Sequence, residues 1–369
     1  MKRTIALIIV VIGIIGVIWY LQSTSSSVRP SSKGSDITVP VSTAVPAEKK
    51  NLSRAKELAD IQGYINTDDT FSIKNLIGKK VILVDFWTYS CINCQRTTPY
   101  LNAWYDKYHD AGLEIIGVHT PEFEFEKKYE NVKAAVEKFG IKYPVVLDSA
   151  YGTWSAYGNR YWPHKYLIDI DGYIAYDHIG EGGYEDTEHA IQAALAERMT
   201  RLGVAGNIDA TIAKPQVDVP VEGKPMSPET YFGSARNEYL GNGKQSASGV
   251  QALQLPSQLK PDTLYLSGKW DFQDEYAQSN SDDAHIVFPY KAKDVYIVAS
   301  AANPVVAHIL VDGKPITAEM RGEDVSADGT ITIQQERLYK LIKNTEWGEH
   351  TIEIIIDKTG LQAYTFTFG

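Results

Sequence analysis

Residues 81–94 read VILVDFWTYSCINC and join a strand signal to a chemical motif. The first seven residues are an apolar, β-branched run interrupted only by Asp85, which is typical of a strand buried on both faces of a sheet. Cys91 and Cys94 follow at i and i+3, where aromatic and apolar residues begin to recur at helical spacing. A helix N-terminus stabilises a thiolate through its free N–H groups and its dipole. The stretch therefore predicts a strand, then a reactive pair of cysteines, then a helix.

The chain has only these 2 cysteines, and three interpretations of the pair are open. A structural disulfide across so short a loop would constrain the unfolded chain little. A zinc site would need two further ligands, and the 8 histidines show no second paired pattern at zinc spacing. The third interpretation, a redox dithiol, is favoured. It requires no metal and no cofactor other than the redox-active disulfide of Cys91 and Cys94.

Further signals on both sides of this stretch predict an α/β domain over residues 51–201. A buried strand is indicated at 113–118, short strands at 145–147, 166–168 and 173–176, and helices at 132–139 and 188–198. Asp171-Gly172 reads as the turn between the last two strands. Strand and helix alternate and are followed by a hairpin and a final helix, which predicts a mixed sheet flanked by helices.

The region around the cysteines resembles the thioredoxin family. The run VDFW before a C-x-x-C motif looks like the active-site strand of thioredoxins, and Pro99 matches the proline that kinks their active-site helix. Trp162-Pro163, before the strand at 166–168, sits where such proteins carry the cis-proline that faces the dithiol. Residues 140–148, GIKYPVVLD, are typical of the TlpA-like and peroxiredoxin-like (redoxin) branch. The resemblance implies a thioredoxin fold in which Pro163 shapes the groove for a partner's backbone.

Longer strings resemble the extracytoplasmic part of thiol:disulfide interchange proteins of the DipZ type. They are FWTYSCINCQRT at 86–97, GVHTPEF at 117–123, NRYWP at 159–163 and GEGGY at 180–184. Full members of that type also carry a multi-helix membrane domain that passes electrons across the bilayer, whereas this chain has one apolar span. The resemblance thus implies a thiol-disulfide active site whose electron donor is a separate membrane protein.

The resemblance also implies a role for each residue of the motif. Cys91 would attack a partner's disulfide, Cys94 would resolve the mixed disulfide, and Asp85 would take the proton of Cys94. A carboxylate inside an apolar strand is costly unless it is paired, and burial should raise its pKa toward the working pH. The alternative is an acid on an edge strand that points to solvent.

Other candidates surround the dithiol. The predicted substrate-binding residues are Trp87, Tyr89, Trp162 and Pro163. For the aromatic residues, packing in the core is the alternative, because aromatics beside buried strands are often structural. His119 and Glu122 follow a strand and either line the rim of the site or belong to an ordinary loop.

The N-terminal residues predict a location. Lys2 and Arg3 precede an uncharged apolar run that ends at residue 21, so residues 1–21 are expected to anchor the chain in the cell membrane. A cleaved signal peptide is the alternative, although the bulky residues 18–21 offer no small-residue cleavage pattern. The positive charges predict a cytoplasmic N-terminus, with the rest of the chain in the periplasm or at the cell surface. Residues 22–50 read as a flexible linker.

The C-terminal part predicts an all-β domain over residues 229–369, joined by a linker at 202–228. Strand signals lie at 263–267, 285–288, 294–299, 307–311, 330–333, 351–356 and 363–368. Regular short strands with Asp-Gly turns suggest a β-sandwich or jelly roll. The DipZ resemblance continues here and implies a carbohydrate-binding-like module, in which Trp270, Tyr276 and Trp347 would stack on sugar or pack in the core.

Composition limits the function further. The 369 residues carry a formal net charge of −10, which argues against a nucleic-acid partner. The predicted function is that of a membrane-tethered thiol-disulfide oxidoreductase acting on disulfide-containing extracytoplasmic proteins, with cell-surface glycan as a possible further partner. The alternatives are a thiol peroxidase of the redoxin class and a cell-wall-binding or glycan-binding protein with an accessory redox domain.

Overall fold

A six-stranded mixed sheet organises the first folded region. The computed structural model describes residue 49, residues 51–217 and residues 224–369. The strand order is β1-β4-β3-β2-β5-β6, with β2, β3 and β4 parallel and the other three antiparallel to their neighbours. The strands are β1 Gly63–Ile65, β2 Val81–Trp87, β3 Leu113–His119, β4 Val145–Leu147, β5 His164–Ile168 and β6 Ile174–Ile179. The predicted thioredoxin-like α/β fold is confirmed.

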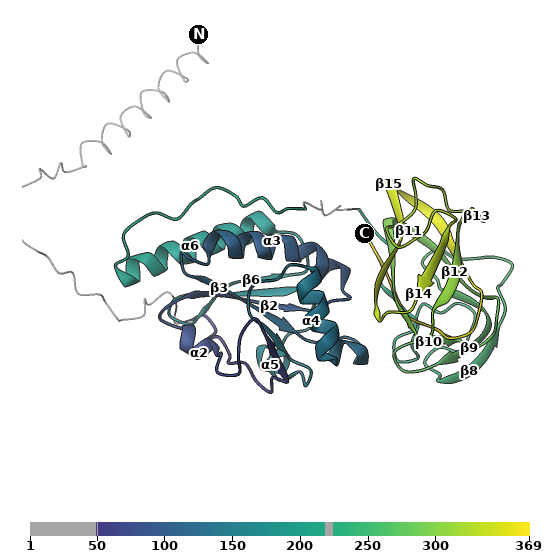
Figure 1. Cartoon of the computed structure of the whole chain (residues 1–369), viewed down its shortest axis with the longest axis horizontal. Coiled ribbons are helices and arrows are strands. Elements are labelled where there is room, and N and C mark those ends of the chain that lie inside the picture. The colour runs from purple at the N-terminus through teal and green to yellow at the C-terminus, as the bar shows by residue number, and fades with distance from the viewer. Residues whose placement is uncertain (1–48, 50, 218–223) are drawn as a thin grey trace, which may run out of the picture. The chain divides into compact units, whose positions relative to one another are not determined.

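Helices cover both faces of this sheet (Figure 1). Strand β2 is buried along its whole length. The helices are α2 Ile73–Leu76, α3 Ile92–Tyr108, α4 Tyr129–Lys138, α5 Gly152–Tyr157 and α6 Tyr184–Leu202, with a 3-10 turn η2 at Glu124–Lys127. Leu83 and Trp87 of β2 pack in the cluster that contains α3, whereas Phe86 packs against Trp154 of α5 on the opposite face. Because side chains alternate along a strand, Asp85 faces α3.

The second region is all β, as predicted, and the described residues form ten strands where seven were expected, some of them much longer than expected. They are β7 Thr230–Tyr231, β8 Gly249–Leu253, β9 Tyr265–Phe272, β10 Ala277–Ser279, β11 Ala284–Ala301, β12 Val305–Val311, β13 Lys314–Pro315, β14 Thr330–Ile333, β15 Arg337–Ile356 and β16 Leu361–Phe368. The strands predicted at 285–288 and 294–299 are a single strand, β11. A register shift between Ala292 and Asp294 bends β11 against β15 in the interval between the two predicted strands.

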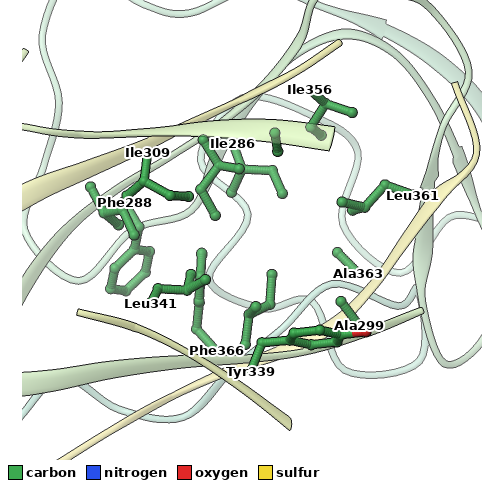
Figure 2. Packing of buried hydrophobic residues seen from close by; sticks show 14 of the residues in the cluster. Ile286, Phe288, Ala299, Ile309, Tyr339, Leu341, Ile356, Leu361, Ala363 and Phe366 are labelled. Carbon is green, nitrogen blue, oxygen red and sulfur yellow. The ribbon is translucent and has the colours of Figure 1, made fainter. Parts of the chain in front are cut away.

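These strands belong to one sheet, not to the two sheets of the predicted sandwich. Strand β11 pairs with β16, β16 with β10, β10 with β9, and β9 again with β11, so the sheet closes on itself like a barrel. Its interior is apolar: Figure 2 shows Ile286, Phe288 and Ile309 opposite Leu341 and Phe366. The closed sheet leaves these side chains without contact with solvent.

The three aromatic residues that were expected either to stack on sugar or to pack in the core differ in their surroundings. Trp270 is fully buried in the apolar interior, so it offers no ring face to a ligand. The ring of Tyr276 packs on that of Tyr364, with centroids 5.2 Å apart. Trp347 is half-buried and donates its indole N–H to the carbonyl of Pro225 at 3.2 Å.

Both regions lie within one compact unit, Thr43–Gly369. Tyr296, Leu338 and Tyr364 of the all-β region belong to the same buried cluster as Trp87 and Leu101 of the first region. The predicted anchor at 1–21 and all of the linker at 22–50 except Lys49 lie outside the described residues. Among the residues that the structure describes, no helix has the length and apolar character needed to cross a bilayer.

Candidate active site

Cys91 and Cys94 lie at the N-terminus of α3. Cys91 is the residue that caps this helix, and the backbone N–H of Cys94 donates to its Sγ at 3.3 Å. Neither cysteine is in a disulfide, so the structure shows the dithiol form. Cys91 is partly exposed, whereas Cys94 is only 2% exposed. A partner molecule can therefore reach Cys91 and not Cys94.

Burial controls the protonation of the groups behind Cys91. Burial raises the pKa of the Cys94 thiol well above its ordinary value, and the neighbouring Cys91 adds to this effect. Burial also raises the pKa of Asp85, to about 7. Asp85 is 2% exposed and lies on β2, one of the two central strands of the six-stranded sheet. It is therefore not the solvent-facing acid of the alternative interpretation. Near neutral pH its carboxyl group can both accept and release a proton.

A buried lysine accompanies Asp85. Lys165 of β5 lies directly across from Asp85 in the antiparallel pairing of β2 and β5, and its side chain is fully buried. The positive charge of Lys165 lowers the pKa of Asp85 and so limits the increase caused by burial. The ammonium group donates to the carbonyl of Gly180 at 3.0 Å. In the described part of the chain, no hydrogen-bond donor reaches Oδ1 of Asp85.

Trp162 and Pro163 lie beside Cys91. The peptide bond between them is cis, as the resemblance implied. The thiol of Cys91 donates to the carbonyl of Trp162 at 3.9 Å. Cys91 and Trp162 line one cleft, with a volume of about 460 Å³. The structure thus places the cis-proline segment against the exposed sulfur.

Trp87 and Tyr89 are placed behind the dithiol and do not line this cleft. Both are buried and pack on His119, with the Tyr89 ring stacked on the imidazole at 5.8 Å. The hydroxyl of Tyr89 donates to the carbonyl of Glu336 at 3.1 Å. His119 accepts from the backbone N–H of Tyr89 at 3.3 Å, and burial lowers its pKa to about 3. His119 is therefore a neutral group beneath the site and not a rim residue.

Two glutamates shape the loop that faces Cys91. Glu122 lines the cleft. Glu126 is fully buried, and its carboxylate accepts from the hydroxyl of Ser90 at 2.6 Å and from the backbone N–H of Phe123 at 3.0 Å. It therefore ties the residue before Cys91 to the loop after β3.

Lys165 and Glu126 did not emerge from the sequence as site residues. A lysine or glutamate is normally solvent-exposed, so its charge alone gave no signal. The position of Lys165 inside an apolar strand, two residues after Pro163, is the feature that marks it. Glu126 lies in a run of alternating charged and aromatic residues that resembles an exposed surface.

Comparisons with known proteins identify the family. Residues 53–195 match the family described as Redoxin, and residues 227–369 match the family described as the thioredoxin-like C-terminal domain. The chain is 30% identical over 141 residues to the thiol-disulfide oxidoreductase YkuV of Bacillus subtilis, covering 38% of this chain and 93% of that protein. It is 33% identical over 145 residues to the thiol-disulfide oxidoreductase ResA of Bacillus thuringiensis, covering 38% and 79%. The chain belongs to the thioredoxin-like thiol-disulfide oxidoreductases.

The similarity to known proteins extends over both regions of this thiol-disulfide oxidoreductase. Protein DipZ of Mycobacterium bovis is 35% identical over 325 residues, which is 88% of this chain. The chain spans 44% of the length of that relative. The shared region therefore includes the dithiol and the C-terminal all-β region together.

Proposed function

We propose that this oxidoreductase reduces or exchanges disulfides of partner proteins through the dithiol of Cys91 and Cys94. The observation that supports it most is the difference in exposure of the two sulfurs, because a partner can approach Cys91 while Cys94 stays covered. The membership of the family and the contact between the Cys91 thiol and the carbonyl of Trp162 add to this support. No cofactor beyond the cysteine pair is required.

The reaction proceeds in two exchanges. The Cys91 thiolate attacks one sulfur of the partner's disulfide, which forms a mixed disulfide and releases the partner's other sulfur as a thiolate. The Cys94 thiolate then attacks Cys91 Sγ, which forms the Cys91–Cys94 disulfide and releases the second thiolate of the partner. Two protons pass from the dithiol to the partner, and the two cysteines are oxidised as the partner is reduced.

Asp85 takes the proton from Cys94 in the second step. The high pKa of the buried Cys94 thiol means that it needs a base, and the carboxylate of Asp85 faces α3 from the adjacent strand. With a pKa of about 7, Asp85 accepts the proton near neutral pH and releases it again to the departing thiolate or to water.

The proposed setting is extracytoplasmic and membrane-tethered. Residues 1–21 would act as the anchor with a cytoplasmic N-terminus, and disulfide-containing extracytoplasmic proteins would be the partners. The oxidised dithiol would be reduced again by a separate membrane electron donor. The C-terminal region would be an accessory module, with cell-surface glycan as a candidate ligand.

Turnover of a disulfide substrate by the full chain tests the proposal. With dithiothreitol as reductant, wild type should reduce insulin disulfides, Cys91→Ser should not, and Cys94→Ser should not turn over. The matched assay with hydrogen peroxide in place of insulin addresses the peroxidase alternative. Disulfide reduction that survives in Cys91→Ser, or Cys91-dependent consumption of peroxide without disulfide reduction, would contradict the proposal.

A further inference from the structure

The cleft at Cys91 has two walls that come from different regions of the chain. Its volume is about 460 Å³, within the usual range of small-ligand sites. It is lined by Cys91, Ile92 and Trp162 of the thioredoxin-like region and by Tyr231, Arg236 and Phe368 of the all-β region. Cys91, the residue that meets the partner, therefore faces residues that lie 140 or more positions away in sequence.

The second wall is fixed to the first by Glu122. The guanidinium of Arg236 donates to Oε1 of Glu122 at 2.8 Å, and the hydroxyl of Tyr231 donates to the same oxygen at 2.7 Å. The guanidinium also lies over the Tyr231 ring, 3.7 Å from its centroid. The Glu122 side chain is only 9% exposed, so this ion pair is shielded from water on the carboxylate side.

Further contacts hold the same loop against the all-β region. The backbone N–H of Glu124 donates to a carboxylate oxygen of Glu275 at 2.9 Å. The rings of Phe123 and Phe125 pack on Tyr364, with centroids 5.1 and 4.9 Å apart. These contacts fix the position of the loop after β3 against the all-β region. The position of this loop in turn sets the width of the cleft.

The cleft is lined by charges of both signs: Glu122, Glu181 and Glu229 with Arg160 and Arg236. Glu122 forms an ion pair with Arg236, and Glu181 forms one at 3.2 Å with Arg96, which is outside the lining. Because both signs of charge line the cleft, its net charge alone does not select a partner. The Arg236 side chain is 40% exposed, and a guanidinium has five N–H donors, more than its bond to Glu122 uses. Those donors suit the carbonyl oxygens of a peptide backbone.

We infer that the all-β region is the second wall of the substrate cleft, and that Arg236 and Tyr231 are positioning residues which select disulfides carried on extended polypeptide segments. An extended segment enters between the two walls, whereas the flat face of a rigid folded domain meets the second wall before it reaches Cys91. This inference rests on the proposed function and names its substrate class.

Three disulfides of different size test it. They are bis(2-hydroxyethyl) disulfide, a pair of short unstructured peptides joined by one disulfide, and native ribonuclease A. Reduced full-length wild type should show a kcat/KM for the peptide pair about tenfold or more above that for ribonuclease A. Arg236→Gln should lower kcat/KM for the peptide pair by about tenfold, mainly through KM, and leave the small disulfide within about twofold.

Variants separate this positioning role from a merely structural one. Arg236→Lys keeps the charge toward Glu122 and should recover part of the peptide activity. Tyr231→Phe removes only the hydroxyl and should show a smaller loss in the same direction. Arg321→Gln, a change of the same type outside the cleft lining, should leave all three substrates unchanged. If Arg236→Gln does not fold, as judged by thermal melting, Tyr231→Phe provides the same comparison.

The results for the three disulfides distinguish a failure of the inference from a failure of the proposed function. If wild type reduces none of the three disulfides, the proposed function fails. If wild type reduces them but prefers ribonuclease A, or if Arg236→Gln and Tyr231→Phe leave the peptide rate unchanged or lower all three rates equally, the inference is overturned while the proposed function stands.

Discussion

At Asp85 the chain places an ionisable side chain in a strand that is otherwise apolar and buried. Water cannot solvate the carboxylate there, so its pKa rises from 3.8 to about 7, which corresponds to about 4 kcal/mol against the charged form. Lys165 across the sheet lessens that cost with its positive charge. A group tuned to titrate near neutrality, beside a thiol whose pKa burial raises, has the properties of a general base.

Replacing Asp85 with asparagine should slow disulfide reduction and change its pH dependence. Since proton transfer by a positioned group is usually worth roughly 10²–10⁴-fold, we expect about a hundredfold loss above pH 7, where the wild-type carboxylate is ionised. The loss should shrink below pH 7, because the wild-type carboxyl is then protonated as well. The pH profile of insulin reduction measures this, and superimposable profiles would show that Asp85 takes no part in the reaction.

The same substitution should stabilise the fold at high pH. A carboxyl whose pKa is higher in the folded protein favours folding below the unfolded-state pKa, and that contribution is lost as the pH rises through about 7. Asparagine does not ionise, so the Asp85→Asn variant does not lose stability in this way. Its free energy of unfolding should exceed that of wild type by up to about 4 kcal/mol above pH 7, and the two values should approach each other below pH 4. Urea unfolding at both pH values measures the difference.

Sequence patterns predicted the site residues unevenly. Asp85 stood out because a lone acid interrupts an apolar run, and the two cysteines stood out through their spacing. Lys165 and Glu126 were missed, because only their burial distinguishes them from ordinary surface charges. Tyr89 was expected beside the substrate, but its ring is held behind the dithiol by stacking on His119.

At the level of secondary-structure elements, the position of the N-terminus of α3 depends on the loop that precedes this helix and on the loop after β3. Glu126 joins the two, because its buried carboxylate accepts hydrogen bonds from Ser90 on one side and from the backbone of Glu122 and Phe123 on the other. The position of Cys91, the next residue after Ser90, therefore depends on a side chain from η2. Burial raises the pKa of Glu126 to about 6.

Glu126→Gln should destabilise the protein and loosen the start of α3. An amide turns one of the acceptor oxygens into a donor that faces other donors, and an unsatisfied buried group costs about 1–3 kcal/mol. We expect urea unfolding to show a loss of that size, and hydrogen exchange to show faster exchange at the Ser90 and Phe123 amides. Glu124→Gln is the matched control, since the Glu124 side chain is 73% exposed, and it should change little. Equal effects of the two substitutions would contradict this role.

Element boundaries followed from the sequence where a strand or helix is bounded by clear signals. Strand β2 has the predicted limits, and α3 begins directly after Cys91. In the all-β region the prediction divided β11 into two strands and included only the last part of β15, because polar residues interrupt the apolar pattern within both strands. The structure accommodates these residues by bending the strands, and a bend of this kind leaves no distinct pattern in the sequence.

At the scale of the whole molecule, the sequence predicted two folded regions but not the contact between them. Tyr89 and Glu336, 247 positions apart, are joined by a hydrogen bond, and Glu122 and Arg236, 114 positions apart, by an ion pair. Such pairs have no local periodicity that would reveal them. The contact makes the all-β region part of the surroundings of Cys91, which the prediction of a separate, linker-joined all-β domain did not include.

The central claim is that Cys91 attacks a partner's disulfide and Cys94 resolves the product, and a trapped intermediate tests it most directly. The reduced full-length Cys94→Ser and Cys91→Ser variants are each mixed with the disulfide-linked peptide pair, and the products are mapped by mass spectrometry without reductant. We predict that Cys94→Ser accumulates a peptide adduct on Cys91, whereas Cys91→Ser forms none because Cys94 is buried. An adduct on Cys94 in the Cys91→Ser variant, together with none on Cys91 in the Cys94→Ser variant, would contradict the account.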